Sequence, residues 1–229
     1  MTSVKVCGIR SVADGRAALG AGASYLGFVF WPPSKRFVTP DEAARIIRAL
    51  RADSLSWSAV GVFVDPTPEA ANEAARVCGL DFIQLSGNEK AARVHSMPGP
   101  TIKAIHVRIG QEPAAVETIE RNALGADLYL LDTHAESLPG GTGRTFDWHA
   151  LRSVGPRCWV GGGLHPDNVT AALQTLEPKG VDVSSGVEHP TGGKDPQRIR
   201  AFLEAVKRHD AFTAGIARRW AEELDGAHD

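Results

Sequence analysis

The sequence predicts an α/β fold: a single (β/α)8 TIM barrel with a short extra C-terminal helix. Eight short apolar runs alternate with eight stretches typical of helices, and this strict alternation indicates a parallel sheet. The runs are almost continuously apolar, as are strands that are buried on both faces. A chain of 229 residues suits one compact barrel of eight units. A doubly wound open sheet is the alternative, but it would have to omit or reorder some of these units.

The expected strands are the runs rich in Val, Ile, Leu and Phe, beginning with "VKVC" and ending with "VDVSS". Each is short and is followed by polar residues or glycine, as strands that lead into βα loops are. In order along the chain, they cover residues 4–7, 24–30, 59–64, 81–85, 101–107, 127–132, 158–162 and 181–185.

The expected helices follow the strands, and several have recognisable ends. Thr39, Thr67 and Asp195 each stand before a proline, which is typical of a capped first turn. Gly22, Gly79 and Gly125 close three of the helices, as glycines at C-terminal caps do. In order, the helices cover residues 12–22, 39–50, 67–79, 88–96, 112–125, 146–153, 165–176 and 195–208.

We expect residues 1–208 to form the catalytic barrel domain and residues 209–229 to form a C-terminal helical extension. The stretch "IARRWAEELDG" is typical of a helix, and no strand precedes it, so it lies outside the eight units. No linker, low-complexity segment or short repeat divides the chain.

The composition excludes several classes of protein. With 43% hydrophobic and 23% charged residues and a net charge of −2, the chain gives no reason to expect a nucleic-acid partner. No apolar run approaches the ~18 residues of a membrane span, so we expect no membrane partner. Three cysteines cannot form a disulfide framework, which predicts a reducing, cytoplasmic location. The eight histidines are scattered, so we expect no metal site.

Polar side chains at the ends of the expected strands are the candidates for chemistry, because the βα loops carry the active sites of such barrels. Cys7 ends the first strand and Asp132 ends the sixth, so the two can face each other across the mouth. A buried cysteine is often only an inert core residue; this alternative applies to Cys7 and more strongly to Cys78 and Cys158. An acid after four apolar residues is costly to bury without a partner, which favours a role for Asp132, or a place as a helix cap.

Lys5 has the same strand parity as Cys7, so both side chains should point into the barrel. A buried ammonium group needs a carboxylate nearby, and either Asp132 or Asp182 can supply it. The cation would also help Cys7 to ionise, because a positive neighbour lowers the pKa of a thiol from its ordinary value of ~8.5.

Three glycine-rich loops follow the last three strands: "LPGGTGRTFDW", "WVGGGLHPDN" and "VSSGVEHPTGGKD". Backbone N–H groups in such loops bind anions, and barrels often hold phosphate after strands seven and eight. The loops therefore predict a phosphate site, although plain turns would also be rich in glycine. Arg36 follows Lys35 on the loop after the second strand, where a guanidinium either meets a substrate carboxylate or is simply solvated.

Together these motifs resemble the phosphoribosylanthranilate isomerase family of tryptophan biosynthesis. The match runs in order over nearly the whole barrel, through "KVCGIR", "GFVFWPPSKRFV", "VGVFVD", "IQLSGNE", "LLDT", "GGTGRTFDW", "GGGLHPDNV", "GVDVSSGVE" and "GKD". The resemblance implies the Amadori rearrangement of N-(5-phosphoribosyl)anthranilate to 1-(2-carboxyphenylamino)-1-deoxyribulose 5-phosphate. It implies no metal or organic cofactor, and its expected partner is this small phosphorylated aminosugar.

The resemblance also implies roles for residues of this chain. Cys7 corresponds to the general base, Asp132 to the general acid, and Arg36 to the group that meets the anthranilate carboxylate. Three further residues are expected to contact the substrate: Gln84, Ser86 and Asp182. The phosphate cradle is expected to comprise Gly141, Gly143, Gly162, Gly163, Ser184, Ser185 and Gly186.

The rearrangement itself needs these types of residue. The sugar ring opens when an acid protonates the ring oxygen, and the resulting Schiff base loses the proton on C2 to a base on the opposite side. Binding the phosphate and the carboxylate at the two ends of the substrate holds C2 between the base and the acid.

One departure from the family pattern concerns Ser86. The family usually reads "QLHG" after the fourth strand, whereas this chain reads "QLSG". The change keeps open a second function, a phosphosugar-binding barrel with altered or no turnover. A third, an isomerase of a histidine-pathway aminoaldose, would favour an acidic pair and a glycine cradle that "FVDPTPE" lacks. The sequence also leaves open the choice between monomer and homodimer.

Overall fold

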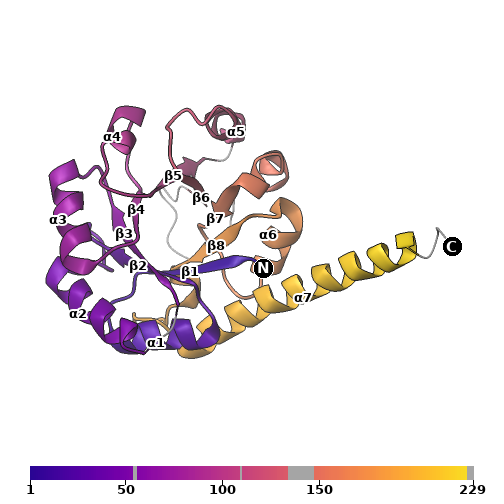
Figure 1. Cartoon of the computed structure of the whole chain (residues 1–229), viewed down its shortest axis with the longest axis horizontal. Coiled ribbons are helices and arrows are strands. Elements are labelled where there is room, and N and C mark those ends of the chain that lie inside the picture. The colour runs from indigo at the N-terminus through magenta and orange to yellow at the C-terminus, as the bar shows by residue number, and fades with distance from the viewer. Residues whose placement is uncertain (54–55, 109, 134–146, 226–229) are drawn as a thin grey trace.

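The computed structural model describes residues 1–53, 56–108, 110–133 and 147–225. Its centre is a closed barrel of parallel strands that pair in chain order, with β8 beside β1 (Figure 1). This arrangement confirms the predicted (β/α)8 class. The strands are β1 (Ser3–Cys7), β2 (Tyr25–Val29), β3 (Ser58–Phe63), β4 (Phe82–Leu85), β5 (Thr101–Val107), β6 (Leu128–Thr133), β7 (Cys158–Val160) and β8 (Gly180–Val183).

Helices surround the barrel, and several begin at the caps that the sequence predicts. Thr39 and Glu42 form a reciprocal capping box, and the Thr67 hydroxyl accepts a hydrogen bond from the backbone N–H of Ala70. The helices in the described residues are α1 (Val12–Ala21), α2 (Pro40–Arg51), α3 (Pro68–Cys78), α4 (Ala91–His95), α5 (Glu112–Glu120), α6 (Val169–Leu176) and α7 (Pro196–Asp225).

The prediction of a helix at residues 146–153 is wrong for residues 147–153, the part of that range that the structure describes. Residues 147–157 there contain only two short 3-10 turns, η1 (His149–Leu151) and η2 (Gly155–Arg157).

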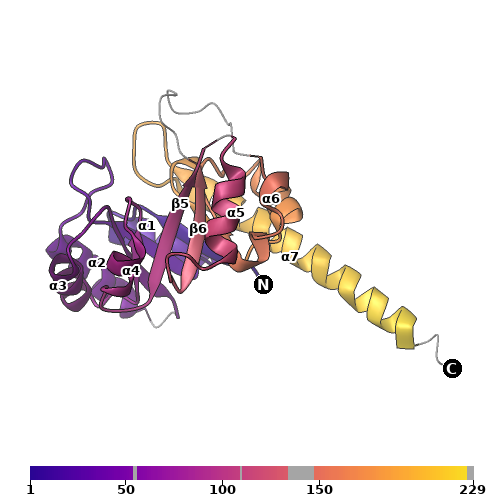
Figure 2. The ribbon, with the colours of Figure 1, turned by 90° about the horizontal axis from the view of Figure 1, so that it is seen from above.

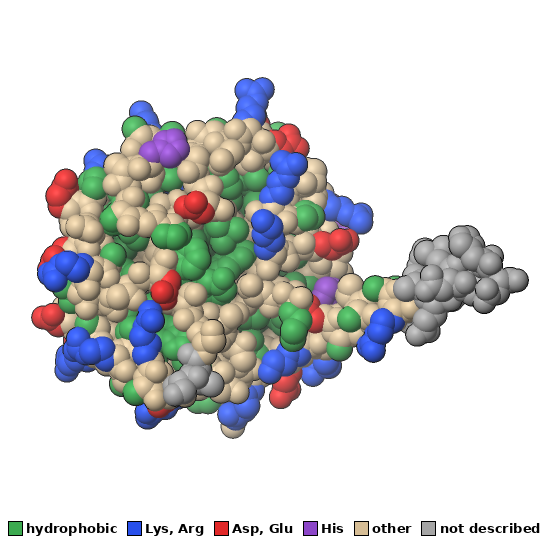
Figure 3. All heavy atoms as spheres, in the orientation of Figure 1, with side chains coloured by type: hydrophobic (Ala, Val, Ile, Leu, Met, Phe, Trp, Pro, Cys, Tyr) green, Lys and Arg blue, Asp and Glu red, His purple; other side chains and the backbone are tan. Residues whose placement is uncertain are grey.

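Side chains along each strand alternate between the barrel interior and the surrounding helices. The parallel register aligns Ile102 with Leu128 and Leu130 with Trp159, and these inward side chains form a small apolar cluster with Val60 and Ala104. Figure 3 shows hydrophobic side chains gathered at the centre of one face of the barrel, with charged side chains around the rim. The interior is therefore a packed core rather than a pore, as in other barrels of this class.

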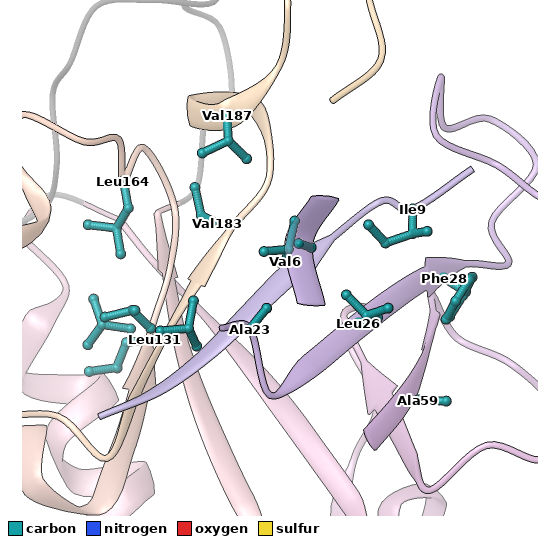
Figure 4. Packing of buried hydrophobic residues seen from close by; sticks show 14 of the residues in the cluster. Val6, Ile9, Ala23, Leu26, Phe28, Ala59, Leu131, Leu164, Val183 and Val187 are labelled. Atoms are coloured by element: carbon teal, nitrogen blue, oxygen red, sulfur yellow. The ribbon is translucent and has the colours of Figure 1, made fainter. Parts of the chain in front are cut away.

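The outward side chains form the larger core, between the strands and the helices. Val6, Leu26, Phe28 and Leu131 are completely buried there and lie on neighbouring parts of the sheet (Figure 4). Burial of each such side chain contributes about 1.5–3 kcal/mol, so this layer supplies most of the driving force that holds the strand ends in place.

Helix α7 runs without a break from Pro196 to Asp225, so the residues expected to form a separate extension continue the last barrel helix. Figures 1 and 2 show it lying along the barrel and then continuing past it. Phe202 is completely buried, and Asp210 accepts two hydrogen bonds of 2.7 Å from the backbone N–H and the hydroxyl of Thr2. Beyond this contact, Phe212 is 63% exposed. No helix in the described part of the chain is both long and apolar enough to cross a membrane.

The burial along α7 predicts unequal effects of two matched substitutions. Phe202→Ala should lower the free energy of unfolding by about 3–5 kcal/mol, because it leaves a cavity between α7 and the barrel. Phe212→Ala, on the same helix, should change it by less than about 0.5 kcal/mol, because the side chain is exposed. Urea unfolding measures both. Equal losses would contradict the assignment of the helix beyond Asp210 to a part that does not pack against the barrel.

Candidate active site

The mouth of the barrel brings the polar side chains of several strands together. The register gives Cys7, Asp132 and Asp182 the same inward parity at the C-terminal ends of β1, β6 and β8. The Cys7 side chain packs against Val29 and Val62 and is only 7% exposed. The strand ends therefore meet as the sequence predicts, with the thiol at the floor of the mouth.

Asp182, rather than Asp132, is the carboxylate that pairs with Lys5. The Lys5 Nζ atom lies 2.9 Å from Asp182 Oδ1, and the lysine side chain is completely buried. The two residues are also register partners across the seam where β1 meets β8. Burial alone would lower the pKa of Lys5, but the Asp182 carboxylate outweighs this effect and the pKa lies above its ordinary value, so the ammonium stays charged.

The thiol of Cys7 is harder to ionise than the sequence predicts. Burial raises its pKa, and Asp182 adds to the rise, whereas Lys5 and Lys194 act in the opposite direction. The expected influence of Lys5 therefore has the correct sign, but the desolvation of a buried thiolate outweighs it. In the protein without substrate, Cys7 is a neutral thiol next to two cations.

The other two cysteines behave as structural residues. The Cys78 sulfur donates to the carbonyl oxygen of Pro40, and burial raises the pKa of this thiol to about 11. Burial raises the pKa of Cys158, at the start of β7, to about 12. Neither lies at the C-terminal end of a strand, so neither takes part in the mouth.

Arg36 is held in place by Glu188, a residue to which the sequence assigned no role. The Nε and Nη2 atoms of Arg36 donate to the two carboxylate oxygens of Glu188, and Lys194 Nζ lies 3.1 Å from Oε1. Gly8 permits this arrangement, because its φ of +82° suits glycine and a Cβ atom there would collide with the Arg36 side chain. The guanidinium thus spans the space between the end of β1 and the loop after β8.

The charges of this cluster favour the ionised carboxylate. Burial alone would raise the pKa of Glu188, but Arg36 and Lys194 lower it from 4.5 to about 2. Burial lowers the pKa of Lys194, and the nearby Arg36 adds to this effect, although Glu188 and Cys7 oppose it. The two shifts differ because burial is the largest influence on Lys194, whose single carboxylate is shared, whereas Glu188 lies beside the three cations Lys35, Arg36 and Lys194.

On the other side of the mouth, β4, β5 and β6 bring together Gln84, Ser86, His106 and Asp132. The Gln84 Nε2 atom donates to the Ser86 hydroxyl at 3.1 Å, and the buried Gln84 Oε1 has no hydrogen-bond partner among the described residues. His106 Nε2 lies 2.8 Å from the carbonyl oxygen of Ser86, and its Nδ1 lies 3.8 Å from Asp132 Oδ2. The two predicted contact residues, Gln84 on β4 and Ser86 directly after it, are therefore connected to the candidate acid through His106.

The loops after β7 and β8 approach each other closely at the mouth. A Cβ atom on Gly186 would overlap the carbonyl oxygen of Leu164, so glycine is required for the contact. Figure 4 shows Leu164 close to Val183 and Val187.

The described residues of the predicted phosphate cradle lie in these two loops. Gly162 and Gly163 have positive φ values, and the Ser184 hydroxyl donates to the carbonyl oxygen of Cys7. Ser185 opens the 3-10 turn Ser185–Val187. Gly141 and Gly143 lie outside the described residues.

Three residues at the mouth escaped the sequence analysis: Glu188, Lys194 and His106. His106 shares the inward parity of Ile102 and Ala104 on β5, so a period of two along the strand could have identified it. Glu188 and Lys194 lie in a loop, where no periodicity indicates their direction. No cluster of metal-ligating side chains occurs among the residues that the structure describes.

Comparison with known proteins gives consistent matches over the barrel. Residues 4–205 match the family model described as N-(5'-phosphoribosyl)anthranilate (PRA) isomerase. The chain is 42% identical to the N-(5'-phosphoribosyl)anthranilate isomerase of Geobacter sp. strain M21, over 91% of this chain and 99% of that protein. The relative from Nitrosomonas europaea is 39% identical over 89% of this chain and 94% of its own length.

Comparison with solved structures agrees with these sequence matches. The phosphoribosyl anthranilate isomerase of Thermotoga maritima superposes with a TM-score of 0.78 at 34% identity, covering 90% of this chain and 99% of that one. A phosphoribosyl anthranilate isomerase in complex with reduced 1-(o-carboxyphenylamino)-1-deoxyribulose 5-phosphate superposes with a TM-score of 0.75 at 33% identity. The coverage is again 90% of this chain and 99% of that one.

The Glu188 cluster predicts a pH-dependent contribution to stability. Because its folded pKa lies below the ordinary value, this contribution is complete above about pH 4.5 and is lost as the pH falls toward about 2. Glu188→Gln should therefore lower the free energy of unfolding at pH 7 by on the order of 2 kcal/mol, allowing for solvent screening at the mouth, and by less at pH 3.

Urea unfolding at the two pH values measures the difference. Glu73→Gln is the matched control, because it removes an exposed carboxylate paired with Arg76 and should have little effect at either pH. A deficit in Glu188→Gln that stays the same from pH 7 to pH 3 would contradict the assigned electrostatic role.

Proposed function

Because the chain belongs to the N-(5'-phosphoribosyl)anthranilate isomerase family, we propose that Cys7 and Asp132 are its catalytic base and acid. The protein is an isomerase of tryptophan biosynthesis, and its reaction converts an aminoaldose into an aminoketose without a cofactor. The observation that carries the residue assignment is the shared inward parity of a thiol on β1 and a carboxyl group on β6.

Asp132 starts the reaction. Its carboxyl group donates a proton to the ring oxygen of the ribose, the bond between this oxygen and C1 breaks, and the anthranilate nitrogen forms a Schiff base with C1. A proton donor at this position is needed because the departing oxygen would otherwise leave as an alkoxide.

Cys7 takes the proton from C2 in the second step. The electron pair of the C–H bond moves toward the Schiff-base nitrogen, giving an enolamine that tautomerises to the ketone. Cys7 acts as a thiolate in this step, after its own proton has been lost to solvent. The raised pKa makes this thiolate a stronger base, and Lys5 and Lys194 stabilise its charge. Asp182 keeps Lys5 charged through the whole cycle.

The two anionic ends of the substrate would position C2 between these groups. Arg36 uses Nε and Nη2 for Glu188, which leaves its Nη1 edge for the anthranilate carboxylate. The phosphate would bind to backbone N–H groups of Gly162, Gly163 and the turn Ser185–Val187, and the loop that holds Gly141 and Gly143 would complete the cradle.

The substrate itself is a small phosphorylated aminosugar in this proposal. The alternative of a phosphosugar-binding barrel without turnover finds no support in the comparisons, whose matched relatives are named as isomerases. We also place the enzyme in the cytoplasm, because its three cysteines are unpaired thiols and a reducing compartment preserves them.

Substitution of either catalytic residue should nearly abolish turnover. Cys7→Ala and Asp132→Asn should each lower kcat by at least about 100-fold, because each removes one proton transfer. Product formation from substrate generated in situ measures the loss, and complementation of a tryptophan auxotroph that lacks the isomerase measures it in cells.

Cys78→Ala is the matched control, because it removes a buried thiol outside the mouth and should leave kcat unchanged. A variant of Cys7 or Asp132 that keeps more than about a tenth of the parent rate would refute the role assigned to that residue.

A further inference from the structure

We propose that Lys194 is a positioning residue that holds the phosphate-binding turn Ser185–Val187 in a fixed place relative to Cys7 and Arg36. The inference rests on the proposed function, in which this turn and Arg36 bind the two anionic ends of the substrate. Lys194 belongs to the motif "GKD" just before the last helix. Its side chain is only 1% exposed, although the loop that carries it lies at the mouth of the barrel.

The ammonium group of Lys194 contacts the residues on both sides of the turn. Its Nζ atom donates to the carbonyl oxygen of Ser184 at 3.0 Å and lies 3.1 Å from Glu188 Oε1, and a longer contact of 3.4 Å joins it to the Ser184 hydroxyl. An ammonium group has three donors, so these contacts use all of them. Lys194 would therefore act on a bound phosphate through the turn rather than by direct contact.

The backbone of the loop brings Lys194 back to the turn. Glu188 and Lys194 form an antiparallel β-bridge, and Asp195 donates its N–H to the carbonyl oxygen of Val187 at 2.9 Å. Residues 188–194 thus form a short hairpin with Glu188 and Lys194 at its base. The side chains of these two residues pair where their backbones pair, so the ion pair closes the loop.

Two further contacts connect this loop to the groups that the reaction needs. The Ser184 hydroxyl donates to the carbonyl oxygen of Cys7 at 3.1 Å, and the Glu188 carboxylate accepts two hydrogen bonds from Arg36. Because Lys194 contacts both Ser184 and Glu188, one ammonium group fixes the turn relative to the end of β1 and to Arg36. A substrate bound at both ends needs such fixed spacing, since a displacement of about 1 Å can cost on the order of 100-fold in rate.

The turn has a second support, which differs from Lys194 in its exposure. The Nε atom of Arg198, an exposed residue of α7, donates to the carbonyl oxygen of Gly186 at 3.1 Å. Water can take the place of an exposed donor, whereas the carbonyl oxygen that a buried donor releases is left without a partner. The loss of Lys194 should therefore disturb the turn more than the loss of Arg198.

Inorganic phosphate is the probe of this role. Lys194→Met keeps the approximate length of the side chain and removes its polar contacts, so phosphate should bind at least about 10-fold more weakly. A phosphorus nuclear magnetic resonance titration measures binding without turnover. Binding is the suitable measurement because Lys194 also opposes the rise in the pKa of Cys7, and its loss would lower kcat by this separate route. Lys179→Met removes an exposed lysine just before β8, and as the matched control it should bind phosphate like the parent.

Amide hydrogen exchange separates the position of Lys194 from its charge. In Lys194→Met, the N–H groups of Glu188 and Asp195 should lose more protection than those of β8, because the loop opens locally. If phosphate binds more weakly while these two amides keep their protection, the charge alone is responsible and the positioning role is overturned. Lys194→Gln retains a donor for the Ser184 carbonyl and should lie between the parent and Lys194→Met. It replaces Lys194→Met in both measurements if that variant does not fold.

The phosphate titration also distinguishes failure of this inference from failure of the proposed function. Equal phosphate affinity in the parent and in Lys194→Met overturns the positioning role alone. A parent protein that does not bind phosphate overturns the assignment of the turn Ser185–Val187 to the substrate phosphate, and the positioning role with it.

Discussion

The ion pair between Lys5 and Asp182 is the contact on which the active-site end of the barrel depends. It joins the first strand to the last at the seam where the barrel closes, two residues before Cys7. The lysine is completely buried, so removal of either partner would leave a charge without compensation, at a cost of about 3–5 kcal/mol. The same contact sets the electrostatics of the thiol, because the Lys5 ammonium lies next to Cys7 and opposes the effect of burial on its pKa.

The other buried lysines also lie beside carboxylates. Lys103 pairs with Glu89, whereas Lys194 shares Glu188 with Arg36 and Lys35. The cluster at Glu188 therefore has more positive than negative charge, which favours the binding of substrate anions at the mouth. These anions can also bind to backbone N–H groups and to the remaining edge of Arg36, which donates directional, charge-assisted hydrogen bonds. Lys5 and Lys194 in addition oppose the rise in the pKa of the Cys7 thiol.

Local sequence signals predicted the barrel well, because they depend on near neighbours in the chain. Apolar runs located the strands, and Thr39 and Thr67 located two helix starts. The helix expected at residues 146–153 was wrong over residues 147–153, where the chain forms only the turn η1. Cys7 and Asp132 could be identified as candidates from their places at the ends of strands. The sequence could not decide whether Asp132 or Asp182 is the partner of Lys5, because this depends on the register of strands far apart in sequence. Glu188 was hidden for the same reason, since its partner Arg36 lies on the other side of the seam.

The contact between Thr2 and Asp210 has a consequence for the topology of the chain. Its two hydrogen bonds bring the start of β1 next to a point on α7 where the helix leaves the barrel. After passing through the eight units, the chain therefore lies close to the point at which it began. A short linker from residue 210 to residue 2 would allow circular permutation, with new ends cut in a surface turn and the ring of strands intact. The same barrel would then form even if a different βα unit came first in the chain.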